Sequence, residues 1–301
     1  MGIVSRFRFQ VQAMIYKSYQ DLSDAIRRNL WKIPQDVDII VGIPRSGMIA
    51  ALMVAELLGR RCASLDDFLD GNIMSCGDRQ TLLGRGRPGK VLVIDDTVNT
   101  GAAIVRARKM LVTMTGPYDI LFGCVFARGR DAKALVNIWL EDIYVPGERW
   151  YLYEWNIMHH HAHKTQAMMW DIDGVLCQDP PSERDTKAYE YYLEHAVPMV
   201  VPTTPIGAIV TYRLEKYRDI TERWLKRHGI QYNDLIMFQA DSREERNATS
   251  YPGRYKAHQY KKSDWATLFV ESDREQAARI CELSGKPVFC YGDGKMYLKC
   301  P

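Results

Sequence analysis

The chain has 301 residues, 47% of them hydrophobic, a formal net charge of +3 and seven cysteines. This length allows two domains, the small net charge gives no argument for a nucleic-acid partner, and no apolar run is long enough to span a bilayer. The cysteines are scattered without a Cys-x-x-Cys pair and the N-terminus has no secretory signal pattern, so we expect a cytoplasmic protein with reduced thiols.

The first elements alternate between helix and strand. Apolar residues at helical spacing predict an amphipathic helix over 18–30, and a short apolar run predicts a strand over 37–41. Residues 42–48 (GIPRSGM) follow, and then an apolar helix over 49–58. The N–H groups at the start of such a helix, together with the Arg45 guanidinium, can bind an anion. By itself this loop is weak evidence, because a simple strand-to-helix turn has the same pattern.

A long polar connection follows over 66–89. It contains glycines and carries Arg79, Arg85 and Arg87. A connection of this length is usually a functional lid or a disordered segment. It would either place arginines over a reacting centre or remain a solvated loop, and the residues do not indicate which arginine would act.

The most informative stretch begins with apolar residues 91–94, which predict a buried strand. Asp95 and Asp96 come next, and residues 97–101 (TVNTG) lead into a predicted helix over 102–110. In open α/β sheets, ligands bind beyond the carboxyl ends of the strands. A helix N-terminus there offers free N–H groups to a phosphate, and adjacent carboxylates can accept hydrogen bonds from neighbouring ribose hydroxyls.

This stretch closely resembles the phosphoribosyl pyrophosphate (PRPP) motif of the type I phosphoribosyltransferases, and the loop over 42–48 is similar to their pyrophosphate loop. The resemblance implies that the two acids hold the ribose hydroxyls, that residues 97–101 bind the 5′-phosphate, and that Mg²⁺ bridges the pyrophosphate and ribose oxygens. The implied PRPP-binding residues are Arg45, Ser46, Gly47, Asp95, Asp96, Thr97, Val98, Asn99, Thr100 and Gly101. Many purine-type members carry an aspartate where this chain has Asn99, so the general base is left open.

Strands are also predicted over 120–126 and 138–145, and an aromatic-rich segment follows over 146–155. Aromatic faces can stack on a planar base, and a similar segment forms a hood over the base in purine-type phosphoribosyltransferases. By this resemblance Trp150 or Tyr151 is the base-binding candidate. Packing in a core or an interface is the alternative for each.

Four histidines lie in the segment 159–166 between the two halves of the chain, namely His159, His160, His161 and His163. A histidine cluster can bind a metal. No cysteine or carboxylate joins this cluster at a ligand spacing. We therefore predict that the segment is a linker or a domain contact.

A second strand that ends in acids opens the C-terminal half, where apolar residues 167–170 precede Asp171 and Asp173. Two carboxylates one residue apart can hold Mg²⁺ through oxygen ligands, and one of them can attack phosphorus to form an aspartyl phosphate. The segment 171–176 (DIDGVL) strongly resembles motif I of the haloacid dehalogenase (HAD) superfamily. This resemblance implies that Asp171 is the nucleophile and Asp173 the general acid/base.

Two further segments match later motifs of that superfamily, in the same order. A strand over 207–211 ends in Thr211, which by resemblance would hydrogen-bond the transferring phosphoryl group, and Arg213 can add a positive charge nearby. Lys261 and Lys262 precede the next strand. One of them, preferably Lys262, matches the lysine that balances the clustered negative charge.

The last motif is the segment 268–273, a predicted strand that ends in acids, where by resemblance Glu271 or Asp273 would complete the metal site. The implied catalytic residues are Asp171, Asp173, Thr211 and Lys262, and the implied Mg²⁺ ligands are Asp171, Asp173, Glu271 and Asp273. About 40 and about 50 residues separate successive motifs, which is too few for domain-sized caps. The module therefore resembles a capless HAD phosphatase.

The sequence as a whole predicts an α/β chain of two domains joined by the linker 159–166: a type I phosphoribosyltransferase fold, with a parallel sheet flanked by helices, over 1–158 and a capless HAD Rossmann-like domain over 167–301. We expect PRPP-dependent transfer to a nitrogenous base plus Mg²⁺-dependent phosphomonoester hydrolysis, acting in series, with no membrane partner. The alternative is a phosphatase for nucleotide or nucleic-acid ends whose first domain senses PRPP without turnover. Asn99 keeps this alternative open, because many purine-type members carry an aspartate at that position. The first resemblance also suggests a homodimer.

Overall fold

The computed structural model describes residues 14–77, 89–112, 118–147, 150–158, 162–181 and 186–298. It contains two compact units, one over Tyr19–Glu148 and the other made of Met1–Ser18 together with Arg149–Pro301. The boundary thus lies near residue 148 and not in the predicted linker, and the N-terminal segment belongs with the second unit. Within the described ranges, every helix is too short or too polar to cross a bilayer.

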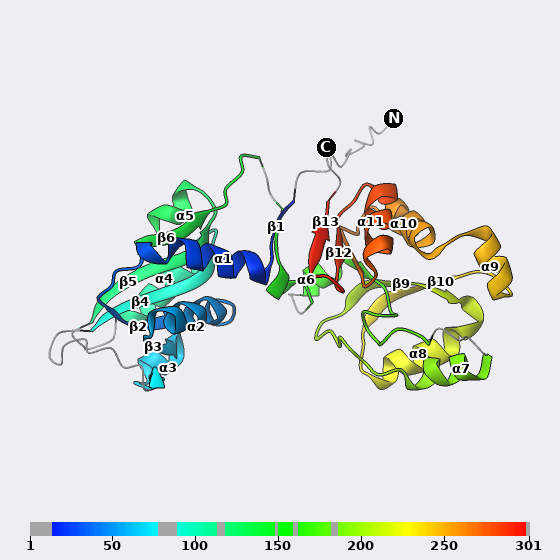
Figure 1. Ribbon diagram of the computed structural model, residues 1–301, viewed down its shortest axis with the longest axis horizontal. Helices are drawn as coiled ribbons and strands as arrows, with labels where there is room; N and C mark the ends of the chain where they lie inside the picture. The colour runs from blue at the N-terminus through cyan, green and yellow to red at the C-terminus, as the bar shows by residue number, and fades with distance from the viewer. Residues whose placement is uncertain are drawn as a thin grey trace, which may run out of the picture. The chain divides into compact units, whose positions relative to one another are not determined.

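The first unit is built on a five-stranded sheet in the order β3-β2-β4-β5-β6, in which every neighbouring pair is parallel (Figure 1). Its strands are β2 (Val37–Gly42), β3 (Arg61–Ser64), β4 (Lys90–Val98), β5 (Asp119–Ala127) and β6 (Ile138–Asp142). The chain forms β3 on one side of β2 and then crosses to the other side to form β4, β5 and β6 in turn. The strand order therefore reverses between β2 and β4, which is where ligands bind in open sheets of this kind.

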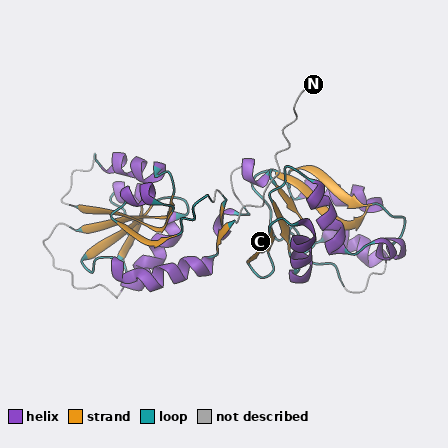
Figure 2. Ribbon diagram, turned by 90° about the horizontal axis from the view of Figure 1, so that it is seen from above, coloured by secondary structure: helices purple, strands orange, loops and turns teal. Residues whose placement is uncertain are grey.

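Helices pack on both faces of this sheet (Figure 2). They are α1 (Tyr19–Asn29), α2 (Gly47–Leu58), α3 (Leu65–Leu69), α4 (Ala102–Leu111) and α5 (Arg130–Ala134), with a short 3-10 turn, η1 (Leu30–Lys32), after α1. Alternate strand residues such as Val91 and Val93 share a core cluster with Ile104 of α4, because successive strand side chains point to opposite faces. The other face receives α2, which packs against β2 and β4.

The second unit contains a six-stranded sheet in the order β10-β9-β8-β11-β12-β13, parallel except for β13. Its strands are β8 (Met168–Trp170), β9 (Ile206–Leu214), β10 (Tyr232–Phe238), β11 (Leu268–Glu271), β12 (Val288–Cys290) and β13 (Lys295–Tyr297). From β8 the chain forms β9 and β10 on one side, and β11, β12 and β13 on the other. This sheet also has a reversal of strand order, between β8 and β11.

The helices of the second unit form two layers around its sheet (Figure 1). They are α6 (Ala162–Thr165), α7 (Thr186–His195), α8 (Arg218–Arg227), α9 (Arg243–Thr249), α10 (Pro252–Lys262) and α11 (Arg274–Ser284), with a 3-10 turn, η4 (Glu215–Tyr217), before α8. Trp170 of β8 packs in one core cluster with Trp224 of α8. Its neighbour Met169 packs in another with Tyr260 of α10 and Ile280 of α11. The predicted α/β class with parallel sheets is confirmed.

A two-stranded parallel sheet ties the N-terminal segment to the second unit. In it β1 (Ile15–Lys17) pairs with β7 (Tyr151–Tyr153), which is followed by η3 (Glu154–Asn156). The Tyr16 hydroxyl donates a hydrogen bond to the carbonyl oxygen of Gly294 at 2.9 Å, and its ring lies 6.1 Å from that of Phe289. The aromatic segment predicted to belong to the first domain is therefore, from residue 150 onward, part of the second unit.

We expect Tyr16→Ala to lower the free energy of unfolding of the second unit by about 1–3 kcal/mol, because it removes a hydrogen bond and a partly buried ring. Tyr191→Ala, on an exposed face of α7, is the matched control and should change it by less than about 0.5 kcal/mol. Hydrogen exchange followed by mass spectrometry in urea would report each unit separately. A loss of protection in peptides from 19–148 alone would contradict the assignment of β1.

Candidate functional site

The first candidate site lies at the carboxyl ends of β2 and β4, beside the reversal of strand order. Asp95 and Asp96 are both buried and lie within β4, not after it, because β4 stays paired with β5 as far as Val98 opposite Ala127. The connection to α4 is therefore only residues 99–101. The strand holds both carboxylates on a paired, well-defined backbone.

The loop after β2 packs directly on these acids. The Ser46 hydroxyl donates a hydrogen bond to Asp96 Oδ1 at 2.9 Å. A Cβ added at Gly47 would lie 2.9 Å from both Asp95 Oδ1 and the carbonyl oxygen of Ile94, which is closer than van der Waals contact allows. Glycine is thus required where the first turn of α2 meets β4.

Two helix N-termini meet the same edge of the sheet. α2 begins at Gly47 and α4 begins after Gly101, and neither start has a side-chain cap. Uncapped N–H groups and the positive end of each helix dipole favour an anion. The residues predicted to bind PRPP lie in the loop between β2 and α2, at the first residue of α2, at the end of β4 and in the loop between β4 and α4. They are Arg45, Ser46, Gly47, Asp95, Asp96, Thr97, Val98, Asn99, Thr100 and Gly101.

Electrostatics at this site favours a bound proton or cation. Burial, and then the adjacent Asp96 carboxylate, raise the pKa of Asp95 well above its usual range. Burial and the charge of Asp95 also raise the pKa of the Cys124 thiol on β5, so that thiol stays neutral. A cation, or a ligand hydroxyl that donates a hydrogen bond to this pair, would favour the ionised form of Asp95 over the protonated one.

The other residues expected near this site are placed differently. Tyr151 is buried in β7 and Trp150 is exposed, both in the second unit, so their base-binding role stays a prediction. Arg79, Arg85 and Arg87 lie outside the described residues. So do His159, His160 and His161, and the side chain of His163 is not described either.

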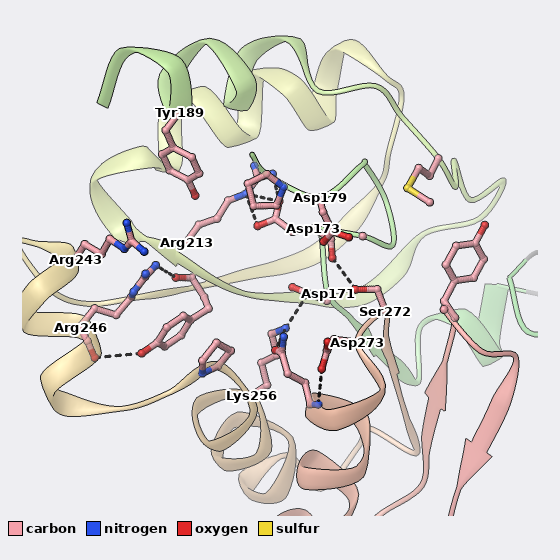
Figure 3. A pocket seen from close by; sticks show the side chains of 18 of the residues that line it. Asp171, Asp173, Asp179, Tyr189, Arg213, Arg243, Arg246, Lys256, Ser272 and Asp273 are labelled. Atoms are coloured by element: carbon pink, nitrogen blue, oxygen red, sulfur yellow. Dashed lines mark hydrogen bonds and ion pairs between the residues drawn. The ribbon is translucent and has the colours of Figure 1, made fainter. Parts of the chain in front are cut away.

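The second candidate site is centred on a buried lysine in the second unit (Figure 3). Lys256 Nζ on α10 donates hydrogen bonds to Asp171 Oδ2 and to Glu271 Oε2, each at 2.7 Å. All three side chains are almost fully inaccessible to solvent. Asp171 follows β8 and Glu271 ends β11, so the ammonium group joins the two strands that flank the reversal of order.

The second oxygen of the Asp171 carboxylate does not accept a hydrogen bond from Lys256. Oδ1 is buried and has no hydrogen-bond partner among the described groups. Burial raises the pKa of Asp171 above its usual range, although the charge of Lys256 opposes this. A buried, unpaired carboxylate oxygen costs free energy unless a ligand or a reacting atom meets it.

Asp173 has a different environment from Asp171. Arg213 donates to it from Nε, at 3.1 Å to Oδ1 and 3.3 Å to Oδ2, and forms an ion pair with it through a second nitrogen. The Tyr192 hydroxyl donates to Oδ1 at 2.8 Å. Burial opposes ionisation of Asp173, but Arg213 outweighs it and the pKa lies below its usual range. The pKa of Asp171 is therefore raised and that of Asp173 is lowered, although only one residue separates the two acids.

Gly174 allows the loops after β8 and β11 to touch. Its φ is +75°, in the left-handed region that favours glycine, and an added Cβ would lie 2.3 Å from Ser272 Oγ. That hydroxyl donates a hydrogen bond to the carbonyl oxygen of Asp173 at 3.2 Å. The close approach fixes the loop that carries both acids against the end of β11.

The lysine predicted at this site is corrected by the structure. Lys262, the last residue of α10, is exposed and lies away from the acids, whereas Lys256 occupies the expected position. Lys256 lies on the buried face of α10 with Gly253, Ala257 and Tyr260. The helical spacing of these residues is the sequence signal that could have identified it.

The remaining predicted residues lie on neighbouring strand ends. Thr211 is fully buried in β9, next to β8, and its hydroxyl oxygen accepts a hydrogen bond from the backbone N–H of Arg213 at 3.2 Å. Asp273 is exposed, and its Oδ1 caps α11 by accepting from Gln276 N at 2.7 Å. Sequence reasoning gave Arg213 only a nearby charge and did not identify Tyr192.

The fit of Mg²⁺ to these residues is partial. Three buried or half-buried carboxylates, of Asp171, Asp173 and Glu271, face only two cationic side chains, and Asp171 Oδ1 is unpartnered. Oxygen ligands and excess negative charge suit Mg²⁺. However, the described residues contain no ready-made group of three or more acid, histidine or cysteine ligands. Lys256 pairs with Asp171 and Glu271, and Arg213 pairs with Asp173, so each of the three carboxylates already has a cationic partner.

A cavity of about 920 Å³ opens over this cluster. Figure 3 shows Asp171, Asp173, Arg213 and Lys256 along it. Partial burial, and then the charges of the neighbouring carboxylates, raise the pKa of Asp179 at its edge. The cavity is large enough for a drug-sized organic molecule.

No protein-family model matches the chain. Among solved structures, it is similar to a purine phosphoribosyltransferase from Pyrococcus horikoshii (16% identity, 47% of this chain and 93% of that one, TM-score 0.34) and to a Helicobacter pylori xanthine-guanine-hypoxanthine phosphoribosyltransferase (15%, 48% and 94%, TM-score 0.35). An orotate phosphoribosyltransferase from Aeropyrum pernix also matches (19%, 42% and 70%, TM-score 0.30). Structural neighbours of the type I phosphoribosyltransferase class thus match about half of the chain.

We expect Lys256→Met to reduce the free energy of unfolding by about 3–5 kcal/mol, because it leaves two buried carboxylates without their cation. Lys262→Met, at the exposed end of the same helix, should change it by less than about 0.5 kcal/mol. Urea denaturation of the two variants tests this. Equal losses in both variants would show that the buried ammonium does not hold the two strands together.

We expect Asp95→Asn to alter how stability depends on pH. Because the native state raises the pKa of Asp95, it binds more protons than the unfolded chain, so wild-type stability should fall as the pH rises from about 5 to about 9. Asp95→Asn should remove much of this slope and be more stable than wild type at high pH. Asp119→Asn, at an exposed carboxylate, is the control, and slopes that are identical in all three proteins would contradict the raised pKa.

Proposed function

We propose that the chain is a bifunctional enzyme. Its first unit transfers the 5-phosphoribosyl group of PRPP to a nitrogenous base, and its second unit hydrolyses a phosphomonoester through an aspartyl phosphate. The observation that carries the proposal is that each unit gathers paired carboxylates and anion-binding groups at the point where its strand order reverses. The match of about half the chain to phosphoribosyltransferases is consistent with the first activity.

In the transfer reaction, the carboxylates of Asp95 and Asp96 accept hydrogen bonds from the 2′- and 3′-hydroxyls of the ribose. Residues 97–101 and the start of α4 bind the 5′-phosphate, and residues 45–47 with the start of α2 bind the pyrophosphate. Mg²⁺, when bound to the substrate, offsets the charge of the leaving pyrophosphate. The chain contributes mainly by holding the reacting groups in place and by supplying preorganised donors.

In the hydrolysis reaction, Asp171 Oδ1 forms a bond to phosphorus as the bond to the leaving oxygen breaks, and that oxygen takes up a proton from solvent to leave as the alcohol. Water then attacks the aspartyl phosphate, releases inorganic phosphate and restores the carboxylate. Asp173, which Arg213 holds ionised, is suited to accept the proton of that water. Lys256 remains paired with the free Asp171 oxygen and keeps the carboxylate oriented. Asp171, Asp173 and Glu271 are the carboxylates that would hold Mg²⁺, which when bound would offset the charge of the phosphoryl group.

The two reactions fit a sequence in which the first unit makes a nucleotide and the second removes its phosphate. The reason is chemical: both sites handle a phosphorylated sugar and both lie in one chain. Two competing functions give different products. A phosphatase for nucleic-acid ends would prefer a 3′-phosphorylated oligonucleotide, and a PRPP-sensing first unit would bind PRPP without releasing pyrophosphate.

The test incubates the full chain with Mg²⁺, PRPP and pooled nucleobases, and identifies the products by mass spectrometry. We expect a nucleoside from the wild type and its 5′-monophosphate from Asp171→Asn, with phosphate release reduced about 1000-fold or more by loss of the nucleophile. Asp96→Asn should abolish both products, whereas Asp119→Asn should resemble the wild type.

The outcomes separate the alternatives. A lack of any base-dependent product from wild type and Asp171→Asn would end the sequential scheme. Pyrophosphate release without phosphate release would leave only the transferase, and faster hydrolysis of the oligonucleotide than of mononucleotides would favour end processing.

A further inference from the structure

A second hollow adjoins the phosphatase cavity on the side of α9. It has a volume of about 210 Å³ and shares Tyr189, Arg243 and Arg246 with the main cavity. Lys216 completes its lining of cations. Lys216, Arg243 and Arg246 are called the basic cluster below. None of these three residues takes part in the reaction steps described above.

Arg246 is fixed within this wall. It is only 6% exposed, and its guanidinium lies 4.4 Å from the ring centroid of Tyr212. It donates to the Tyr212 carbonyl oxygen at 2.8 Å and to Asn247 Oδ1 at 3.3 Å. The Tyr212 hydroxyl in turn donates to the Arg246 carbonyl oxygen at 3.1 Å. This reciprocal contact between β9 and α9 orients a buried guanidinium before any ligand arrives.

The basic cluster carries more positive charge than the acid in the same hollow can neutralise. Three cationic side chains face one acid of the same hollow, Glu244. Hydrogen bonds from the backbone and from Ser242 lower the pKa of Glu244, and the charges of Arg243 and Lys216 lower it further. Glu244 is therefore ionised at neutral pH. The remaining charge of +2 matches one phosphate group, for which arginine provides paired donors.

We propose that the basic cluster is a second anion subsite, and that the phosphatase, besides removing the phosphate of the nucleotide from the first unit, accepts small molecules with two phosphates, one placed at Asp171 and the other at the cluster. The proposal rests on the phosphatase function proposed above and adds a second substrate class to it. Tyr189 lies in the same cavity as Asp171, Arg243 and Arg246 (Figure 3). Tyr212 also lines this cavity, and the two tyrosines contact the part of the substrate between the phosphates. Hydrolysis removes only the phosphate at Asp171.

The experiment measures binding to the full-length Asp171→Asn protein by calorimetry, so that turnover is not needed. The probes are adenosine 3′,5′-bisphosphate against its two monophosphates, and fructose 1,6-bisphosphate against fructose 6-phosphate. We expect at least one bisphosphate to bind about tenfold or more tightly than its monophosphates, as charge-assisted hydrogen bonds would produce. Added salt should weaken this preference.

Arg243→Gln, in the same background, should abolish the preference and leave monophosphate binding within about twofold. The matched control is Arg254→Gln, because Arg254 is also an exposed arginine but lines a different hollow, beside β10. It should retain the preference. Arg246→Lys tests the buried member of the cluster while keeping its charge, and it should weaken the preference without abolishing it.

Equal binding of mono- and bisphosphates in both pairs, or a preference that survives Arg243→Gln, would overturn the subsite. The two proposals fail separately. Hydrolysis of monophosphates by the wild type without a bisphosphate preference would retain the phosphatase and reject the subsite. A bisphosphate preference without any hydrolysis by the wild type would retain the subsite and reject the phosphatase.

Discussion

The second unit depends on one buried ammonium group. Lys256 carries its charge into the interior, where an unpaired ion is very costly, and two carboxylates from different strands compensate for it at 2.7 Å each. This arrangement requires α10 to present Lys256 toward the junction of β8 and β11. The same contact therefore positions a helix, joins two strand ends and leaves one oxygen of Asp171 buried without a hydrogen-bond partner among the described groups. Stability and reactivity at this site cannot be altered independently.

The two units hold their paired acidic residues in place in different ways. Each places acids where the strand order reverses, but Asp95 and Asp96 lie inside β4, whereas Asp171 and Asp173 lie in the loop after the short strand β8. The first pair is held by hydrogen bonding to neighbouring strands. The second pair is held by side chains, Lys256 and Arg213, and by the close packing of Gly174 on Ser272. Under the proposed function, the first arrangement would bind the ribose and the second would hold the residue that reacts.

The sequence predicted the parts of both sites that depend on local pattern. Apolar runs that end in paired acids identified β4 and β8, and the helices after the loops began within about two residues of their expected positions, within the usual uncertainty of helix ends. Contacts between distant segments were not predictable in this way. Proximity to the next strand favoured Lys261 and Lys262, whereas Lys256 lies on the buried face of α10, one helical turn and more before them. Trp150 and Tyr151 were proposed from their aromatic-rich segment and its resemblance to a hood over the base, whereas pairing with β1 decides which unit contains this segment.

Pairing of β1 with β7 also bears on how the protein is made. Because the N-terminal strand belongs to the second unit, the whole of Tyr19–Glu148 is inserted between two strands of one small sheet. During synthesis the first unit can fold as soon as it leaves the ribosome, since domains generally fold as units. The segment that emerges before it has no partner until β7 follows. Strand β1 must therefore wait without its partner strand while more than a hundred later residues are synthesised, and during that interval it is open to a chaperone or to another nascent chain.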